Sequence, residues 1–333
     1  MNSWIFWGIA ICFGAMMLTG LSLSAEKPVI VNLMVDYDMP ASNIDNLIGI
    51  YNAVGSRNMS WTLFLTEKAA INERLFLATI SPSSNIEMEM SGNHSDEKLS
   101  TISYAEQKDI LGRAKTRLEL CKICDVNEVH AKGFKPQSFD QNEDTYKVLD
   151  EMGLIYDTGF KAGILYAPGH EKDVWPYKVE NHEFYAVPVS TYTLSGENVA
   201  LDDREIKDKG LSSSQWYDML VGKFNEVSGK DEPMVISLST SISGTGDYFE
   251  ALKQFLDYAK SGDASFVKTN DLVNMSITGV HEATAALLPT NAAITAEKST
   301  EATTSGCAEC DTMKNNTNIN AEGQNNTTMV ITV

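Results

Sequence analysis

Short apolar runs alternate with longer amphipathic segments along most of the chain. The short runs are rich in β-branched residues, as strands are, and the longer segments repeat their apolar positions at the spacing of one helix face. This alternation predicts a β/α domain and argues against an all-β or all-α fold. Strands are predicted at residues 29–35, 61–65, 86–90, 154–156, 184–189, 234–238 and 265–267. Helices are predicted at residues 44–54, 68–79, 104–121, 144–152, 216–227 and 248–259.

The N-terminal segment breaks this pattern because residues 4–23 carry no charge. Small residues at Ser24 and Ala25 follow, just before the first charged side chains. This order is typical of a secretory signal peptide, and the apolar run is also nearly long enough to remain in a bilayer as a signal anchor. Residues 1–25 are therefore predicted to export the rest of the chain, so that the protein is secreted or displayed at the cell surface. Any membrane contact is expected only through this leader.

Two further stretches lack the periodicity of helices and strands. Residues 190–214 are polar and are predicted to form a long surface loop. Residues 277–333 are rich in Ala, Thr, Asn and Glu, a composition that buries too little apolar surface to offset the entropy of ordering, and a disordered tail is expected. Asparagine acceptor triplets begin at Asn315, Asn325 and Asn326, which fits export. The folded domain is thus predicted at residues 28–276.

The composition allows a buried core and excludes some partners. The 333 residues are 43% hydrophobic and 9% aromatic, which suits a folded domain of enzyme size. The formal net charge of −19 argues against binding to nucleic acid or to an anionic membrane surface, since both are polyanions.

Four cysteines outside the leader form two CxxC pairs, Cys121 with Cys124 and Cys307 with Cys310. This spacing permits a shared zinc site. Because the pairs lie far apart in the sequence and the chain is predicted to reach an oxidising compartment, disulfides within or between the pairs are favoured.

Unusual polar residues follow two of the predicted strands. Residues 29–35 run into Asp36 and Asp38, and residues 86–90 run into a Ser-Gly-Asn-His-Ser segment that contains His94. Two carboxylates with one residue between them point to the same side of a strand. Carboxylate oxygens and an imidazole from nearby strand ends suit a catalytic Zn²⁺ or a similar divalent ion. Taken singly, such residues are more often helix caps, loop solvation or structural histidine.

The same two segments carry a resemblance to a known family. VNLMVDYDMP and EMSGNHSDEK resemble the first and second motifs of the polysaccharide deacetylase (NodB-homology) family. The resemblance implies an α/β fold, a (β/α) barrel of the distorted seven-stranded type. It also implies that Asp36 is the general base, that Asp38 and His94 are metal ligands, and that zinc is the metal.

Four positions bear on how far the resemblance extends. Lys98 stands where the family's second metal-binding histidine is expected, and an ammonium has no lone pair for a metal. Lys135, in GFKPQSFD, replaces an arginine that grips the catalytic carboxylate. Trp175 matches a tryptophan that forms a wall of the family's site. In MVISLSTSIS, Ser239 lies where the family's general-acid histidine is expected, and a hydroxyl cannot protonate a leaving amine at neutral pH.

Other candidate sites carry less weight. His130, His170 and His182 lie in predicted loops without partners at metal-site spacing, so solvated or locally hydrogen-bonded histidines are expected. The sequence contains no Walker-type phosphate loop, dinucleotide fingerprint or Gly-x-Ser-x-Gly elbow.

Three functions remain open from the sequence. The first is metal-dependent hydrolysis of acetyl groups on an extracellular or cell-envelope polysaccharide, with water activated by the metal and Asp36. The second is a catalytically inactive relative that acts as a glycan-binding or surface module. The third is a glycosidase in which Asp36 or Asp38 faces a second carboxylate such as Asp96, Glu97 or Asp140.

Overall fold

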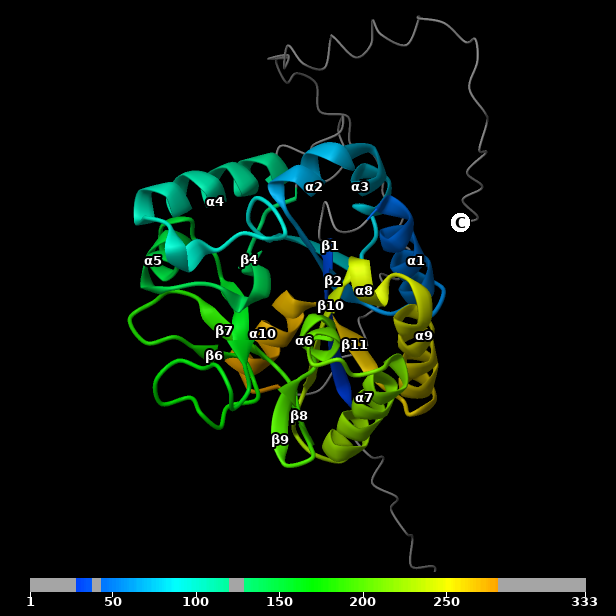
Figure 1. Ribbon diagram of the computed structural model, residues 1–333. Coiled ribbons are helices and arrows are strands. Elements are labelled where there is room, and N and C mark those ends of the chain that lie inside the picture. The colour runs from blue at the N-terminus through cyan, green and yellow to red at the C-terminus, as the bar shows by residue number, and fades with distance from the viewer. Residues whose placement is uncertain (1–27, 38–42, 120–128, 281–333) are drawn as a thin grey trace, which may run out of the picture. The chain divides into compact units, whose positions relative to one another are not determined.

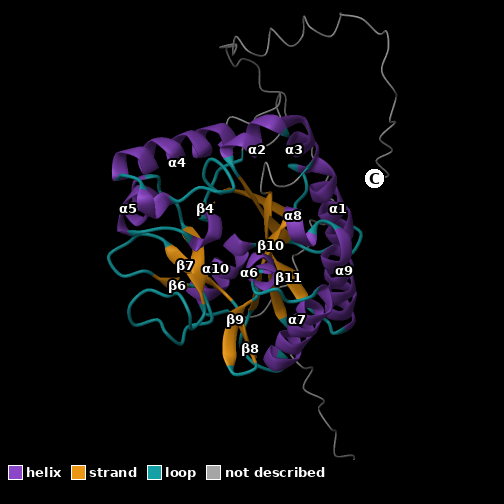
Figure 2. Cartoon of the chain, viewed as in Figure 1, coloured by secondary structure: helices purple, strands orange, loops and turns teal. Residues whose placement is uncertain are grey.

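The computed structural model describes residues 28–37, 43–119 and 129–280. Their centre is a sheet in which seven parallel strands follow the spatial order β10-β1-β2-β3-β4-β5-β7, and an eighth, β11, pairs parallel with β1 off this path (Figures 1 and 2). Every residue of β1 is buried, which is expected of a strand covered on both faces. The seven strands are β1 (Ile30–Tyr37), β2 (Trp61–Leu65), β3 (Ile86–Met90), β4 (Gly133–Phe134), β5 (Tyr156–Lys161), β7 (Tyr185–Val189) and β10 (Met234–Ser239).

The two outermost parallel strands meet, so the sheet closes on itself. Ser190, the residue after β7, donates its backbone N–H to the carbonyl oxygen of Val235 on β10 at 3.0 Å. The Ser190 hydroxyl in turn accepts from the N–H of Val235 at 2.9 Å. The α/β fold, a distorted (β/α) barrel with seven parallel strands, is confirmed. Four further strands complete the described sheets: β6 (Tyr177–Lys178), β8 (Thr191–Leu194), β9 (Glu197–Ala200) and β11 (Ser265–Val267).

Helices surround the strands (Figure 2). Side-chain caps fix where several of them begin; for example, Asn142 and Thr145 form a reciprocal capping box. The α-helices are α1 (Ile44–Gly55), α2 (Glu67–Asn72), α3 (Arg74–Ile80), α4 (Tyr104–Glu119), α5 (Glu143–Glu151), α6 (Asp203–Asp208), α7 (Ser213–Val227), α8 (Thr240–Ser243), α9 (Gly246–Ser261) and α10 (Thr269–Thr278). The 3₁₀ turns are η1 (Leu99–Thr101) and η2 (Gln137–Phe139).

Helix α10 is anchored to the barrel interior. The backbone N–H of Thr269 donates to the hydroxyl of Thr62 on β2 at 2.8 Å. The side-chain amide of Asn32 on β1 donates to the carbonyl of Val267, just before the helix, at 2.9 Å. The first turn of α10 is therefore held by polar side chains from inside the barrel.

The predicted surface loop at 190–214 was wrong. It forms the β8–β9 hairpin and helix α6, and Leu201 and Ile206 are fully buried. Ser195 and Gly196 make the hairpin turn with φ of 52° and 88°, and the Asp202 side chain caps α6 by accepting from the N–H of Glu205. Turn and cap chemistry outweighed the polar composition of the segment.

Smaller differences concern element boundaries. The predicted helix at 68–79 is divided at Glu73 into α2 and α3, and β5 begins at Tyr156 and extends to Lys161. Helix α10 ends at Thr278, two residues past the predicted domain boundary. Among the described residues, no helix has both the length and the apolar character to cross a membrane. The leader, both CxxC pairs, Asp38 and the tail from residue 281 lie outside the described residues.

Candidate functional site at the carboxyl ends of the strands

Asp36 lies one residue before the end of β1, inside the barrel. Its side chain is 1% exposed. In the sheet register it stands beside Phe64 of β2 and Ser239 of β10. The carboxylate is therefore held where parallel strands end, which is the edge at which β/α barrels place their functional residues.

Two cationic side chains hydrogen-bond the same carboxylate oxygen of Asp36. Lys135 Nζ and Arg204 Nη1 each donate to Asp36 Oδ2 at 2.7 Å. The Lys135 side chain is 1% exposed and that of Arg204 is 20% exposed, so the first contact is fully buried and the second reaches toward solvent. Asp36 Oδ1 is buried and has no hydrogen-bond partner among the described residues. We call Asp36, Lys135 and Arg204 the Asp36 cluster.

A tight turn after β4 positions Lys135. The Lys135 N–H donates to the Met90 carbonyl at 3.1 Å, which extends the pairing of β3 with β4. Ser138 and Phe139 then have positive φ values of 52° and 59°, which residues other than glycine rarely adopt. The turn lays the Phe139 ring beside Lys135 Nζ, 5.3 Å from the ring centroid. The strained backbone thus lies at the turn that orients the Lys135 ammonium group.

A second buried acid lies near Lys135. Asp157 on β5 is fully buried, and burial raises its pKa to about 7, although the N–H of Gly159, Gln141 and the charge of Lys135 oppose the rise. Asp157 Oδ1 accepts from the Gly159 N–H at 2.9 Å, and Oδ2 has no partner among the described residues. Asp157 is therefore partly protonated near neutral pH.

His94 lies in the turn that follows β3, so it shares the carboxyl edge of the sheet with Asp36, separated by β2. Its Nδ1 atom is 2.7 Å from Asp96 Oδ1, in ion-pair range but without hydrogen-bond alignment. Within the described residues, no hydrogen bond or ion pair joins His94 to Asp36. Lys98 is exposed at the start of η1.

Glu97 turns inward beneath the same loop. Its Oε2 atom accepts from the Asn93 N–H at 3.0 Å, and its Oε1 atom is buried without a partner in the described chain. Gly92 has a φ of +79°, and a Cβ there would lie 2.2 Å from Glu97 Oε2. Burial raises the pKa of Glu97, opposed first by the Asn93 N–H and then by His94. The loop thus needs glycine at position 92.

The described residues do not by themselves fit a catalytic zinc ion. They contain no group of three His, Cys, Asp or Glu side chains placed to hold a metal. Zinc sites in enzymes take three protein ligands with the fourth position open. Asp36 Oδ2 already faces two cations, and Lys98 points to solvent instead of supplying a ligand. Asp38, the other predicted ligand, lies outside the described residues.

Hydroxyls and a buried carboxyl occupy the end of β10. Asp203 accepts from the N–H of Ser239 and, at 3.2 Å, from the N–H of Ser243. Burial and the charge of Asp202 raise the pKa of Asp203 to about 8. The Ser239 and Ser241 hydroxyl oxygens are 2.8 Å apart. No histidine lies in this part of the described chain, and Asp203 is tied to backbone amides.

Trp175, expected to form a wall of the site, hydrogen-bonds the segment before β10, and its place in a site wall stays a prediction. Its indole N–H donates to the Asp231 carbonyl at 2.8 Å. Asp231 precedes β10, which begins at Met234, whereas Asp36 stands beside Ser239 at the other end of that strand. Trp175 therefore packs near the amino end of β10.

Two of the remaining histidines make local contacts, as expected. His182 Nδ1 is 2.7 Å from Asp150 Oδ2 and its Nε2 atom is 3.4 Å from Glu143 Oε1. His170 stacks on Tyr177 with ring centroids 4.0 Å apart. These contacts join α5 and neighbouring loops to the barrel and show no tie to the Asp36 cluster. His130 is exposed at the rim of a pocket described below.

The sequence did not single out Arg204, Asp157 or Asp203. Arg204 and Asp203 were missed because residues 190–214 were interpreted as a loop. The signal was present, since the apolar Val199–Leu201 run leads into Asp202, a residue type that caps helices. Asp157 stands inside a strand, where a lone acid gives no pattern of its own.

Solved structures show where this fold occurs. A protein assigned as a polysaccharide deacetylase from Mycobacterium smegmatis is 17% identical over 78% of this chain and 93% of its own, with a TM-score of 0.57. One assigned likewise from Pseudomonas aeruginosa is 14% identical over 74% and 90%, with a TM-score of 0.59. PuuE allantoinase is 15% identical over 78% and 93%, with a TM-score of 0.61.

These similarities establish the fold alone because the identities are low. The chain has the fold of the polysaccharide deacetylases, as its motifs predicted. The same fold occurs in an allantoinase, so it does not fix one chemistry. No protein-family model matches the sequence. No curated protein matches it either.

Proposed function

We propose that this protein binds a glycan at the carboxyl ends of its barrel strands and does not hydrolyse acetyl groups. The main support for the proposal is the pair of hydrogen bonds to Asp36, whose Oδ2 atom accepts from both Lys135 and Arg204 at 2.7 Å. A carboxylate that acts as a general base must take up a proton during the reaction. Both donors occupy lone pairs of Oδ2, so that oxygen cannot take up a proton while the two contacts persist.

The positions of the other predicted catalytic residues support the same conclusion. Lys98 is exposed and cannot complete a metal site, and Ser239 offers a hydroxyl where an acid is needed. Losing a metal ligand and a general acid each costs orders of magnitude in rate. Together these replacements leave a barrel that retains its fold and has lost the chemistry.

Arg204 is the side chain of the Asp36 cluster best placed to touch a ligand. Its side chain is 20% exposed, whereas Asp36 and Lys135 are each 1% exposed. A guanidinium presents five N–H donors in a plane; Nη1 bonds Asp36 and Nη2 is buried, and the remaining N–H groups suit hydroxyl or carboxylate oxygens of a sugar. The glycan partner is proposed because solved proteins with this fold are assigned as polysaccharide deacetylases. The leader-like N-terminus supports a partner outside the cytoplasm, in an envelope or extracellular polysaccharide.

A metal-dependent deacetylase is the second candidate, and a specific observation favours it. Asp36 Oδ1 and Glu97 Oε1 are buried without partners among the described residues. Glu97 and His94 come from the same loop after β3. Oxygen and imidazole groups of this kind suit zinc if Asp38 joins them.

One experiment separates the two candidates. The full chain is incubated with insoluble chitin and with peptidoglycan, with and without added Zn²⁺, and both bound protein and released acetate are measured. We expect saturable binding without acetate release, and weaker binding by Arg204→Ala. Arg57→Ala is the matched control, since Arg57 pairs with Asp257 between α1 and α9, away from the Asp36 cluster. Acetate release that depends on zinc and on His94 would support the deacetylase instead.

A further inference from the structure

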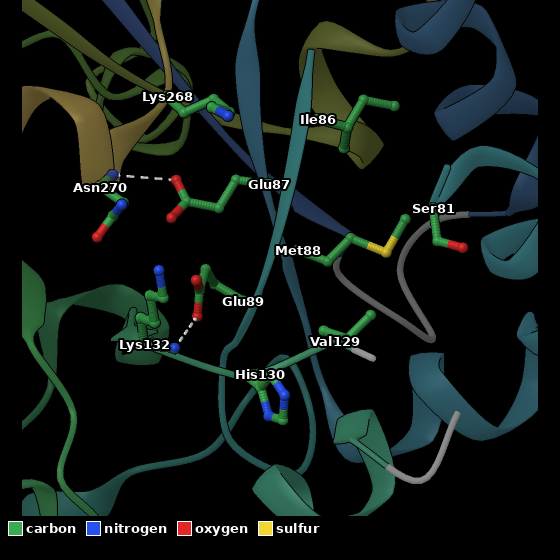
Figure 3. A pocket seen from close by; sticks show the side chains of 10 residues that line it. All are labelled: Ser81, Ile86, Glu87, Met88, Glu89, Val129, His130, Lys132, Lys268 and Asn270. Atoms are coloured by element: carbon green, nitrogen blue, oxygen red, sulfur yellow. Dashed lines mark hydrogen bonds between the residues drawn. The ribbon is translucent and has the colours of Figure 1, made fainter. Parts of the chain in front are cut away.

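A pocket of about 320 Å³ opens beside β3, on the side where the strands begin (Figure 3). Its polar lining includes Glu87 and Glu89 of β3, Lys132 just before β4, and Lys268 and Asn270 at the start of α10. Glu87 lies near the start of β3 and Lys132 just before β4, whereas Asp36 lies near the end of β1 and Lys135 just after β4. The pocket is within the size range of small-molecule sites, roughly 300–1,000 Å³.

Two glutamates form the floor of this pocket. Residues 87 and 89 are two apart in a strand, so their side chains point to the same side. Glu87 Oε2 accepts from the Thr62 hydroxyl and the Asn270 N–H, each at 3.0 Å. Glu89 Oε2 accepts from the N–H groups of Lys132 and Gly133, each at 2.7 Å. Each carboxyl group thus commits one oxygen to the fold and keeps the other for its neighbour or a ligand.

Burial disfavours the ionised form of both carboxyl groups. Burial raises the pKa of both residues, and for Glu89, which is fully buried, the charge of Glu87 raises it further. Glu87 accepts from the N-terminus of α10, where the helix dipole favours a negative charge.

The charges around the pocket nearly cancel. Its lining contains two lysines, Lys132 and Lys268, and two glutamates, so their formal charges balance. Lys268 Nζ donates to the Ser84 carbonyl at 3.3 Å and lies 3.7 Å from Asp271 Oδ2. A site for an inorganic anion or a divalent cation would carry a clear excess of the opposite sign. The balance found here suits a neutral ligand.

The other side of the pocket is aliphatic. Ile86, Met88 and Val129 contribute to its lining, and no Phe, Tyr or Trp does so in the described chain. Figure 3 shows the glutamates, Lys132 and Asn270 on one side and Met88 and Val129 on the other. A sugar ring has hydroxyl groups along its edge and C–H groups on its faces. The hydroxyl groups match the polar side of the pocket, and the C–H groups match its aliphatic side.

We propose that the pocket beside β3 binds one neutral sugar or polyol unit, as a second ligand site separate from the Asp36 cluster. Glu87, Asn270 and Lys132 hydrogen-bond the hydroxyl groups, and the aliphatic side chains contact the ring face.

The test is binding of glucose, N-acetylglucosamine and its β-1,4-linked dimer to the full chain, followed by calorimetry and by saturation-transfer NMR. The chain is produced in a host without N-glycosylation. Asn270→Ala removes the side-chain amide but keeps the backbone N–H that bonds Glu87. We expect its affinity to fall about threefold to tenfold, the effect of one hydrogen bond. The control is Asn274→Ala, which changes an exposed residue one turn later on the same helix.

A second variant, Ser81→Phe, fills the pocket from its rim and keeps the backbone bond of Ser81 to Leu77. It is expected to abolish binding while the far-UV circular dichroism remains native. Absence of saturable binding by all three sugars, or equal affinity in Asn270→Ala and Asn274→Ala, would overturn the proposal. Arg204→Ala distinguishes the two sites, since it weakens binding to chitin and leaves the pocket beside β3 unchanged.

Discussion

Arg204 and Asp36 are 168 residues apart in the sequence and in direct contact, with Arg204 Nη1 2.7 Å from Asp36 Oδ2. Lys135 bonds the same oxygen, so one carboxylate carries two cations. A buried ion pair is weak evidence for stability, because desolvation opposes the attraction, but removing one partner leaves a buried charge uncompensated. The Asp36 cluster is therefore a fixed charged group that constrains both the fold and any chemistry at this end of the barrel.

Lys135→Met is expected to destabilise the fold by about 3 kcal/mol, because it leaves the buried Asp36 with only one cation. The measurement is urea unfolding followed by circular dichroism at pH 7. Lys135→Arg, which retains the charge, serves as the control and should lose less. A loss below about 1 kcal/mol in Lys135→Met would mean that Arg204 alone compensates Asp36.

The free energy of unfolding should fall as the pH rises from about 4 to about 7. The unfolded chain loses the Asp157 proton near pH 4, whereas burial keeps that proton in the folded state up to about pH 7. Stability from this group is thus present at low pH and is lost as the pH approaches the folded pKa, by up to roughly 4 kcal/mol. Asp157→Asn should flatten the profile. The exposed Asp218→Asn should leave it unchanged, and equal slopes in both variants would refute the assignment.

Gly92→Ala should destabilise the loop after β3 by about 1–3 kcal/mol. The residue has a φ of +79°, and the new Cβ would meet Glu97 Oε2 at 2.2 Å. In the double variant Gly92→Ala, Glu97→Ala, the clash between the new Cβ and the Glu97 carboxylate disappears. Only the free-energy cost of the positive φ at position 92 remains. The double variant should therefore lose less than the sum of the single variants in thermal unfolding, and strict additivity would count against the contact.

Lys98→His should not create a zinc site, even though a histidine occupies the matching position in the family motif. Lys98 is exposed at the start of η1, and the inward side chain of this turn is Glu97. Zinc content after dialysis, measured by atomic absorption, should be the same in Lys98→His and the unmodified chain. Stoichiometric zinc in the variant alone would show that the loop can place position 98 at the carboxyl edge of the sheet.

The sequence predicted the barrel well because long apolar runs mark buried strands with little ambiguity. The predicted limits of β2, β3 and β11 agree with those observed. Strand β4 was missed, since two residues, Gly133 and Phe134, are too short to show a period.

The site was less accessible to prediction than the fold. The contact of Lys135 with Asp36 follows from motif order, but the contribution of Arg204 depends on a hairpin that brings residues 168 positions apart together. Glu87 and Glu89 lie in the predicted strand at 86–90, and alternating acids in a strand are typical of a side that faces solvent. In this barrel the two glutamates instead lie on its inner side, which only the tertiary structure reveals.

The most direct test of the account is the release of acetate from acetylated chitin oligomers by the full chain in the presence of Zn²⁺, measured together with chitin binding. We expect binding that Arg204→Ala weakens, with acetate release no faster than in the absence of protein. Zinc-dependent acetate release that is lost in both Asp36→Ala and His94→Ala would contradict it.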